Sequence, residues 1–545
     1  MAVWQPDFGE DSRLMQRRSK LFIAAMSALM VLLAACGNNA TTSPSNSAAG
    51  KTLVIDHAYA WDFSKDNDPS RGGVDFEADP FFHAVYDSLL TFKLGDSSTP
   101  IPLVAQSYTV SPDAKTFTFI IRKDVKFADG TPLTARDVEF TFNRLLNLHD
   151  NPVYLVEGIT SMKATDDYTF VLVSSVSNPA IPFIVTNPAL GIINSKLLMA
   201  HGGSAAKDAA TTDTAKDFLS TTSVGSGPYV MSSVSTSQVV MKANAKYWGP
   251  NKPNFGTVIF RNVAAATQQI EIQKASNQIE LSLSGDQAAS LKSNTALNVT
   301  SFTSPNITFA FCNRKTYAAC ANDHFVNAIR YGIDYQGLIS VAGAGAAQAP
   351  GVVPSQFLGA LPQSQAVKRD VTKAKSELQA SGVSNPAIDL DYTISTTGLN
   401  DSLAAKIKAN LAEVGITVNL NGQPSSIATP NYRGAKYRLG LAGWAPDYPD
   451  PNNYQAFLPG QLVGKRAGWL AGAAPDIEAL GARAGATPDN ATRGQLYQQL
   501  QTLMNQKSPM LPLIQPGQSV VANKNLTNVT YSPVWYLDFA SIGTA

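Results

Sequence analysis

Beyond residue 50, apolar and polar residues recur along the chain with the spacings of both strands and helices. Residues 51–55 form a short apolar run, and residues 116–121 alternate Thr with apolar side chains, as strands do. Residues 80–92 place apolar side chains at helical spacing, namely Phe81, Phe82, Val85, Leu89 and Leu90. Strand and helix patterns in several blocks predict mixed α/β lobes.

A further helix is predicted to begin after Thr134. Thr is a favourable N-cap residue, and acidic side chains follow it in the first turns. Its inward stripe would consist of Val138, Phe142 and Leu145. Because a turn at residues 111–114 precedes the strand at 116–121, this segment is predicted to run strand, loop, helix.

The second half of the chain has the same kind of pattern. Residues 370–382 predict a short helix capped by Asp370. Asp401 is predicted to cap a longer helix, which Gly415 would end. The apolar face of that helix is Leu403, Ile407, Leu411 and Val414. A strand should follow directly, since Ile416, Val418 and Leu420 alternate with polar residues.

The composition narrows the class of protein. A chain of 545 residues predicts about two to four lobes. Hydrophobic residues make up 44%, which allows a large core and excludes disorder of the whole chain. Lys and Arg number 42 and Asp and Glu 41, a formal net charge of +1. Without clustered basic charge, no nucleic-acid partner is expected.

The first 36 residues differ from the rest of the chain. A basic cluster at residues 17–20 precedes an uncharged apolar run, residues 21–33, of signal-peptide length. The run ends in Leu-Ala-Ala-Cys-Gly at residues 33–37, which resembles the bacterial lipobox, where the cysteine is lipid-modified. We therefore expect residues 1–35 to be a lipoprotein signal peptide and Cys36 to carry a lipid. A plain secretory signal with an incidental cysteine is the alternative.

The segment after Cys36 predicts how the protein is held. Residues 36–50 are rich in Asn, Ser and Thr and are expected to form a flexible tether. No later apolar run is long enough to span a bilayer. The expected location is therefore extracytoplasmic, in the periplasm or at the outer face of the cytoplasmic membrane, with a lipid anchor. The sequence leaves open whether Met1 or Met15 is the start.

Two further cysteines, Cys312 and Cys320, lie eight residues apart. In an oxidising compartment they can close a small disulfide loop, and two buried free thiols are the alternative. The five histidines are scattered, and none has ligand spacing from these cysteines. We expect no metal site and no cofactor.

One long segment resembles a known family. Residues 123–144, KDVKFADGTPLTARDVEFTFNR, resemble the signature of the extracytoplasmic solute-binding proteins of the peptide/nickel ABC-transporter family. Other stretches match in the same order, including residues 102–107, 225–229, 244–249, 327–334 and 443–451. The resemblance covers roughly residues 53–539. Val326 and residues 277–280 depart from the family pattern.

The resemblance implies a periplasmic-binding-protein-like α/β fold of type II. Two main lobes would close on a ligand about a hinge, and an extra subdomain would be added. The implied boundaries are lobe I at 51–88, 198–304 and 510–545, subdomain II at 89–197, and lobe III at 305–509. The implied partners are a peptide ligand, the lipid membrane, and the permease and ATPase subunits of an ABC transporter, with the binding protein itself a monomer.

The resemblance also implies a ligand site. Trp444, with Gly443 and Ala445, lies where the family pairs with the backbone of its ligand. Asp447 matches the carboxylate that meets the α-amino group of a peptide, and a turn cap in a Pro-rich loop is the alternative. Asp450, before Pro451, is expected to be structural.

Two more residues are candidates for ligand contact. Tyr154 follows the signature helix where family members offer a Tyr to the ligand, and it could equally be a packed loop aromatic. Arg71 could bind a ligand carboxylate through its planar guanidinium, although a solvated surface Arg is the expected reading.

The predicted function is solute binding without catalysis. The chain has no Gly-x-Ser-x-Gly, no His-Glu-x-x-His and no phosphate loop, so a secreted hydrolase is the less favoured class. A structural lipoprotein is a third class. Peptides are the default ligand, with nickel chelates and oligosaccharides as alternatives. Few histidines disfavour direct nickel ligation. Trp61, Trp444 and Trp535 could stack on sugars, but spread tryptophans are more often core.

Overall fold

The computed structural model describes residues 50–545, except residues 59–62, 66, 73–78 and 250–251. The predicted signal peptide, Cys36, the tether up to residue 49 and Trp61 lie outside the described residues. No helix in the part of the chain that the structure describes is both long and apolar enough to cross a membrane.

A seven-stranded sheet has the strand order β12-β19-β11-β1-β10-β9-β8. The predicted first strand is its centre, where β1 runs parallel to both β10 and β11. On one face, Phe81 and Phe82 of α2 share a buried core with Leu53 and Ile55 of β1. The strands are β1 Thr52–His57, β8 Tyr229–Val234, β9 Gln238–Ala243, β10 Thr257–Asn262, β11 Gln278–Glu280, β12 Leu297–Thr303 and β19 Gly517–Asn523.

A four-stranded antiparallel sheet, β4-β5-β7-β6, surrounds the signature segment in sequence, and α3, which begins within that segment, packs on it. Val138, Phe142 and Leu145 of α3 are buried as predicted. An Asp137 carboxylate oxygen accepts the Thr134 backbone N–H at 2.8 Å, which secures the start of the helix. The elements are β4 Ala105–Val110, β5 Thr116–Ile121, α3 Ala135–Leu148, β6 Ile159–Asp166 and β7 Thr169–Ser174.

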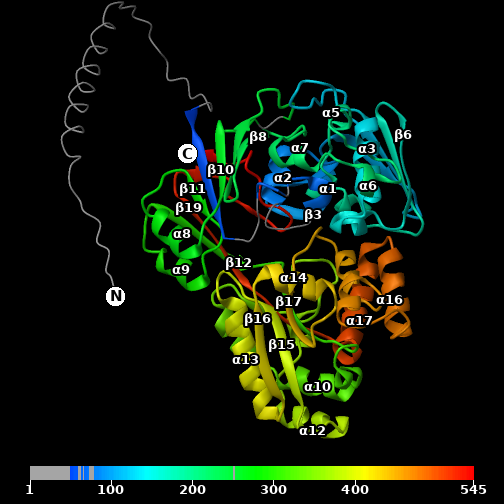
Figure 1. Cartoon of the computed structure of the whole chain (residues 1–545), viewed down its shortest axis with the longest axis vertical. Coiled ribbons are helices and arrows are strands. Elements are labelled where there is room, and N and C mark those ends of the chain that lie inside the picture. Colours follow the sequence, from blue (N-terminus) through cyan, green and yellow to red (C-terminus); the bar gives the residue numbers. More distant parts are fainter. Residues whose placement is uncertain (1–49, 59–62, 66, 73–78, 250–251) are drawn as a thin grey trace, which may run out of the picture. The chain divides into compact units, whose positions relative to one another are not determined.

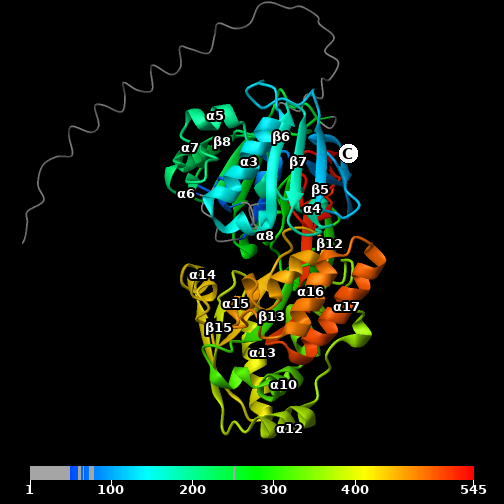
Figure 2. The same ribbon diagram turned by 90° about the vertical axis from the view of Figure 1, so that its right-hand side faces the viewer.

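A six-stranded sheet has the order β14-β18-β13-β17-β15-β16. Helices α10 and α13 share a buried core with it on one face, and α16 and α17 share a second core with it on the other; Figures 1 and 2 show this layering. The strands are β13 Ile307–Cys312, β14 Ala347–Gln348, β15 Ala387–Thr393, β16 Thr417–Gln423, β17 Leu439–Trp444 and β18 Met510–Gln515. The helices are α10 Asp323–Gly332, α11 Tyr335–Ala342, α12 Val371–Ser381, α13 Leu399–Val414, α14 Ser425–Arg433, α15 Leu462–Arg466, α16 Pro475–Ala486 and α17 Asn490–Lys507.

The other helices and strands of the described residues are short. They are α1 Pro69–Gly72, α2 Asp79–Val85, β2 Leu90–Lys93, β3 Asp96–Pro102, α4 Ile181–Ile184, α5 Ser195–Ala200, α6 Ala209–Thr212, α7 Lys216–Thr221, α8 Ala265–Glu271 and α9 Gly285–Ser290. Short strands follow near the C-terminus at β20 Leu526–Thr527, β21 Tyr531–Ser532, β22 Tyr536–Leu537 and β23 Gly543–Thr544.

The chain passes between the seven- and six-stranded sheets at two adjacent crossings. The first follows β12 and the second follows β18. At these crossings the Ser304 N–H donates to Pro516 O at 2.9 Å, and Gln515 Nε2 donates to Ser304 O at 2.8 Å. The predicted return to lobe I at residue 510 comes too early, because Met510–Gln515 pair with β13 as strand β18.

Two predicted helix ends also differ from the structure. Helix α2 stops at Val85, and Leu90 already belongs to β2. Gly225 and Gly227 pack against the backbone there, where a Cβ on Gly225 would lie 2.0 Å from Val85 O. Helix α13 begins at Leu399 after Gly398, so Asp401 lies in its first turn and is not the cap.

Candidate functional site

The Asp447 carboxylate lies in the loop that follows β17, and it is buried, with 9% of the residue exposed. Asn453 Nδ2 donates to Asp447 Oδ2 at 2.8 Å, and the Tyr154 hydroxyl donates a second hydrogen bond to this carboxylate. Burial raises the pKa of Asp447 to about 6, although both hydrogen bonds lower it. Burial and the neighbouring carboxylate raise the pKa of Tyr154 well above its usual value.

No cation compensates this charge among the residues that the structure describes. The pKa of Asp447 is raised by burial and lowered by hydrogen bonds from Tyr154, from Asn453 and from its own backbone, all of them neutral. A buried carboxylate held only by neutral donors favours a cation from outside the chain. The Asp447 side chain thus binds one partner from its own loop, Asn453, and one from a distant segment, Tyr154.

The loop that carries Asp447 is attached to the segment of the four-stranded sheet. Asn187 Nδ2 donates to Asp447 O at 2.6 Å, and Asn452 Nδ2 donates to Asn178 Oδ1 at 3.3 Å. The Tyr448 ring is buried in the hydrophobic core of that sheet. These contacts bring the carboxylate and Tyr154 together although they are distant in sequence.

Strand β17 ends shortly before Asp447, and one edge of its last residues is unpaired. β13 pairs with β17 along its length, including Thr308 opposite Gly443. On the other edge, the described pairing with β15 stops at Leu441. Gly443 is exposed and Ala445 is half-buried. An unpaired strand edge beside a buried carboxylate can bind an extended ligand backbone.

Asn453 and Tyr454 are site residues that sequence reasoning missed. Asn453 Oδ1 accepts from Trp444 Nε1 at 2.8 Å, so one amide links Trp444 to Asp447. The buried Tyr454 hydroxyl has no hydrogen-bond partner within the described ranges, and burial together with Asp447 raises its pKa well above the usual value. The Asn-Asn-Tyr run at residues 452–454, which begins five residues after Asp447, was the available signal.

The structure places Arg71 among carboxylates of the protein itself. It forms ion pairs with Asp68 at 3.4 Å, with Asp213 at 3.3 Å and with Asp150. The buried Arg144 binds Asp68 and Asp213 as well, at 2.6 and 2.8 Å. Arg71 is 22% exposed, so it is neither a solvated surface Arg nor a free receptor for a ligand carboxylate.

Asp450 serves the architecture of the loop. It caps a short 3-10 helix, Pro451–Phe457, and forms a buried ion pair with Arg493 of α17 at 2.8 Å. The side chains of both residues are almost fully buried, at 1% and 2% exposed. The pair connects the loop to α17 without contacting Asp447.

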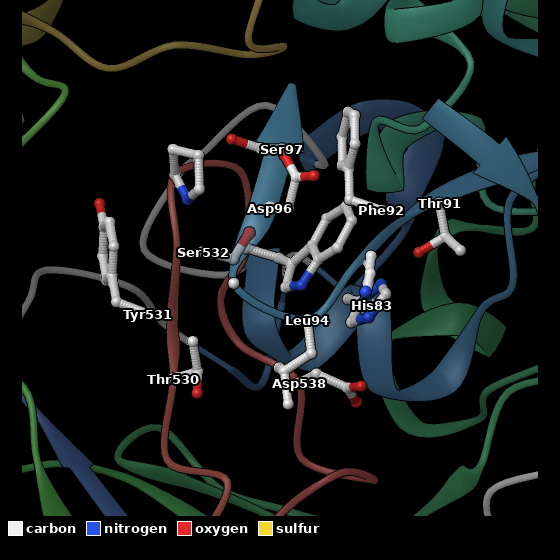
Figure 3. Close-up of a pocket in the computed structure, with 14 residues that line it drawn as sticks. His83, Thr91, Phe92, Leu94, Asp96, Ser97, Thr530, Tyr531, Ser532 and Asp538 are labelled. Atoms are coloured by element: carbon white, nitrogen blue, oxygen red, sulfur yellow. The ribbon is translucent and has the colours of Figure 1, made fainter. Parts of the chain in front are cut away.

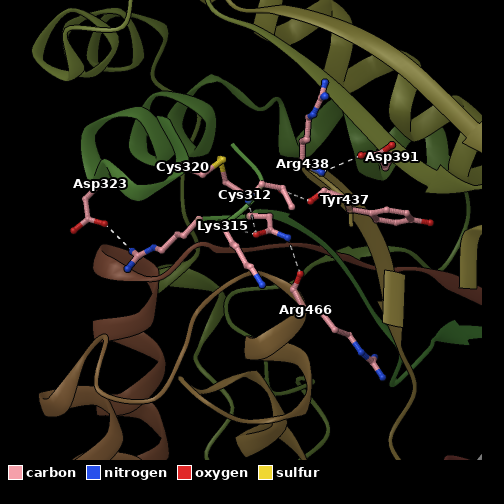
Figure 4. The surroundings of a disulfide bond; sticks show 11 residues. Cys312, Lys315, Cys320, Asp323, Asp391, Tyr437, Arg438 and Arg466 are labelled. Atoms are coloured by element: carbon pink, nitrogen blue, oxygen red, sulfur yellow. Dashed lines mark hydrogen bonds and ion pairs between the residues drawn. A yellow bond between two sulfur atoms is a disulfide. The ribbon is translucent and has the colours of Figure 1, made fainter. Parts of the chain in front are cut away.

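The structure joins Cys312 at the end of β13 to Cys320 in a disulfide, with their Cα atoms 5.2 Å apart. Figure 4 shows the bond beside Arg438, whose backbone N–H binds Asp391. No cluster of three metal-ligating side chains occurs in the described part of the chain.

A small cavity of about 70 Å³ lies between the β2–β3 hairpin and the C-terminal segment (Figure 3). His83 stacks on Trp535 with ring centroids 4.1 Å apart and planes 9° apart. Phe92 packs against the same indole at 5.7 Å. Trp535 is only 4% exposed, so this indole is a core residue and does not offer a face to a sugar.

Comparisons with known proteins place the chain among transport proteins. The family model "Bacterial extracellular solute-binding proteins, family 5 Middle" matches residues 99–461. The probable D,D-dipeptide-binding periplasmic protein DdpA of Escherichia coli K12 is 27% identical, over 79% of this chain and 82% of its own. The dipeptide-binding protein of the same organism is 26% identical, over 78% and 83%.

Solved structures show the same fold. The binding protein AgaA of A. tumefacien R10, in complex with agropinic acid, has a TM-score of 0.76 at 21% identity, covering 91% of this chain and 99% of its own. DppA from Helicobacter pylori, in complex with the peptide STSA, has a TM-score of 0.76 at 21% identity, covering 90% and 98%. NikA from Staphylococcus aureus, in complex with Ni(L-His)2, has a TM-score of 0.73 at 16% identity, covering 91% and 100%.

Proposed function

Because the chain belongs to family 5 of the bacterial extracellular solute-binding proteins, and so serves an ABC importer as its non-catalytic binding subunit, we propose that it captures short peptides for the permease. The peptide binds as an extended strand between lobe I and lobe III, with subdomain II against its amino end. Broad specificity follows, since backbone hydrogen bonds ignore the identity of side chains.

The buried Asp447 carboxylate is the observation that carries this proposal. It has neutral partners on the protein and a pKa raised to about 6 by burial. The α-amino group of a peptide supplies the missing positive charge. The open edge of β17 at Gly443 and Trp444 then lies in position for the ligand backbone.

Two features support peptides over the alternative ligands. The described ranges contain no cluster of His, Cys, Asp and Glu side chains that could ligate nickel directly. Trp535 is buried in the core and cannot stack on a sugar. Trp444 packs edge-on against Phe457, with ring centroids 5.8 Å apart. Relatives described as binding dipeptides and di- or tripeptides point the same way.

Cys36 completes the proposed function as a lipid anchor. Its lipobox-like context and the tether after it would hold the binding protein at the outer face of the membrane, as a monomer beside the permease. This arrangement keeps the captured solute near the transporter.

Native mass spectrometry of the purified protein tests the identity of the ligand. We expect bound masses that correspond to short peptides. Incubation with a peptide library should raise the melting temperature with some members and leave every peptide intact. Co-purified sugars or nickel chelates, with no stabilisation by any peptide, would contradict the peptide proposal. Turnover of a peptide would contradict a purely binding function.

A further inference from the structure

An apolar groove of about 710 Å³ lies between α3, β6 and α5, and it shares no lining residue with the site at Asp447. Its floor is apolar and includes Phe140, Leu146, Ile159, Met162 and Met199. Met199 is 53% exposed, although it is a large apolar side chain. Exposed apolar surface with a polar rim marks sites of interaction with other molecules.

The rim of this groove is positively charged. Four basic residues line it, Arg136, Lys163, Lys196 and Lys207, against the single acidic lining residue Glu139. Arg136 forms an ion pair with Asp167 at 2.8 Å. The three lysines form no ion pair with the protein within the described residues. This is a local excess of positive charge in a chain whose formal net charge is only +1.

Hydrogen bonds between its walls fix the positions of the walls relative to one another. Asn143 Nδ2 of α3 donates to Met162 O of β6 at 3.1 Å. Asn147 Nδ2 donates to Ala205 O at 2.8 Å, which fixes the loop after α5. A preformed groove costs little reorganisation when a partner binds.

The hydrogen bonds already made at the outer edge of β6 favour a helix over a strand as the binding partner. β6 is an edge strand of its sheet, and such an edge can accept an added strand. Here Glu139 Oε2 accepts the Ala164 N–H at 2.9 Å, and Asn143 binds Met162 O. Because side chains of α3 already bind these two edge groups, an incoming strand would find fewer free hydrogen-bond partners on β6. A helix needs only the apolar floor.

We propose that the groove binds an acidic amphipathic helix of a partner protein. Apolar side chains at positions i, i+4 and i+7 of that helix would contact Met199 and the floor. Flanking carboxylates would pair with Lys163, Lys196 and Lys207, which gives the complex its charge selectivity. The groove is separate from the ligand site, so the partner binds whether or not solute is bound.

Fluorescence anisotropy with the full-length protein tests this. The probe is a labelled 16-residue helical peptide with Leu at i, i+4, i+7 and i+11 and Glu on its flanks. We expect it to bind at least tenfold more tightly than the same peptide with Gln in place of Glu. Met199→Glu, and the double variant Lys163→Glu/Lys196→Glu, should each weaken binding at least tenfold.

Matched controls separate the groove from general surface effects. Ile270→Glu changes a side chain that is 58% exposed elsewhere. The double variant Lys274→Glu/Lys292→Glu makes the same charge change at two exposed lysines outside the groove. Both should bind the probe as wild type does. Equal binding of the Glu and Gln peptides, or unchanged binding by the groove variants, would overturn the proposal. Groove-dependent binding of phosphatidylglycerol vesicles instead of the peptide would replace the protein partner by a membrane surface.

Discussion

Asp447 holds a carboxylate inside the protein between the Tyr154 hydroxyl and the Asn453 amide. The two neutral donors lower the pKa of this carboxyl less than burial raises it. A positively charged partner would therefore stabilise its ionised form further.

Asp447→Asn keeps the shape of the side chain and removes its charge. Affinity for peptides with a free amino group should fall at least tenfold, about 1.4 kcal/mol, because an enclosed ammonium loses its partner. N-acetylated peptides should bind wild type poorly and be affected much less by the substitution. Titration calorimetry measures both, with Asp391→Asn as a control of equal burial. Undiminished binding by Asp447→Asn would reduce the carboxylate to a loop cap.

The raised pKa of Asp447 also predicts how binding and stability depend on pH. Since the ligand ammonium binds the ionised carboxylate, affinity should fall as the pH drops below about 6. For the ligand-free protein the sign is opposite. Between pH 4 and 6 the folded state holds more protons than the unfolded state, so stability falls as the pH rises through this window. Denaturant unfolding should show wild type losing on the order of 2 kcal/mol relative to Asp447→Asn from pH 4 to 7. A pH-independent difference would contradict the raised pKa.

At the scale of elements, the loop that carries the site is connected to α17 by the buried Asp450–Arg493 pair. Asp450→Ala would leave the guanidinium buried and unpaired, and we expect it to lower the free energy of unfolding by about 3–5 kcal/mol. The pair Arg438–Asp389 is a matched surface control, with side chains 51% and 35% exposed. Asp389→Ala should cost less than about 1 kcal/mol. Similar losses for both variants in urea unfolding would argue against a special role for the buried pair.

The disulfide between Cys312 and Cys320 closes the connection from β13 to α10. We expect thiol titration of the denatured, unreduced and delipidated protein to find neither cysteine free. Reduction before titration should expose both. Two reactive thiols without reductant would show that the pair stays reduced in the exported protein.

At the scale of the whole molecule, the two crossings at Ser304 and Gln515 lie side by side and are hydrogen-bonded to each other. Two short adjacent crossings are the connection that a hinge between lobes requires. They leave the sheets on either side free to close on a ligand as units, which is the motion that we propose for capture.

Anchoring is tested at this scale too. Cys36→Ala removes the proposed lipid site, and we expect the protein to leave the membrane fraction for the soluble extracytoplasmic fraction. Cell fractionation followed by immunoblotting measures the shift. Cys36→Ser should behave in the same way, since Ser does not replace the thiol that is lipidated. A membrane pool unchanged by either substitution would refute the lipid anchor.

Local signals in the sequence were sufficient to predict several helices and strands, and its motifs were sufficient to predict the family. Capping, turn chemistry and apolar spacing predicted α3 from Thr134 and α12 from Asp370, because these signals act within a few residues. Helix α2 was predicted too long, since its end depends on Gly225 and Gly227, which are far away in sequence. The candidate site around Asp447 was predicted from the resemblance of residues 443–451 to a family segment.

Which side chains meet at the candidate site depends on the packing of distant segments. Tyr154 binds Asp447, whereas Arg71 binds the carboxylates of Asp150 and Asp213, and no spacing in the sequence distinguishes these two outcomes. Ion pairs and hydrogen bonds between distant segments depend on how the sheets are placed. The register of β18 and the burial of Asp447 have the same origin, since burial and strand partners are properties of the packed chain and not of its local sequence.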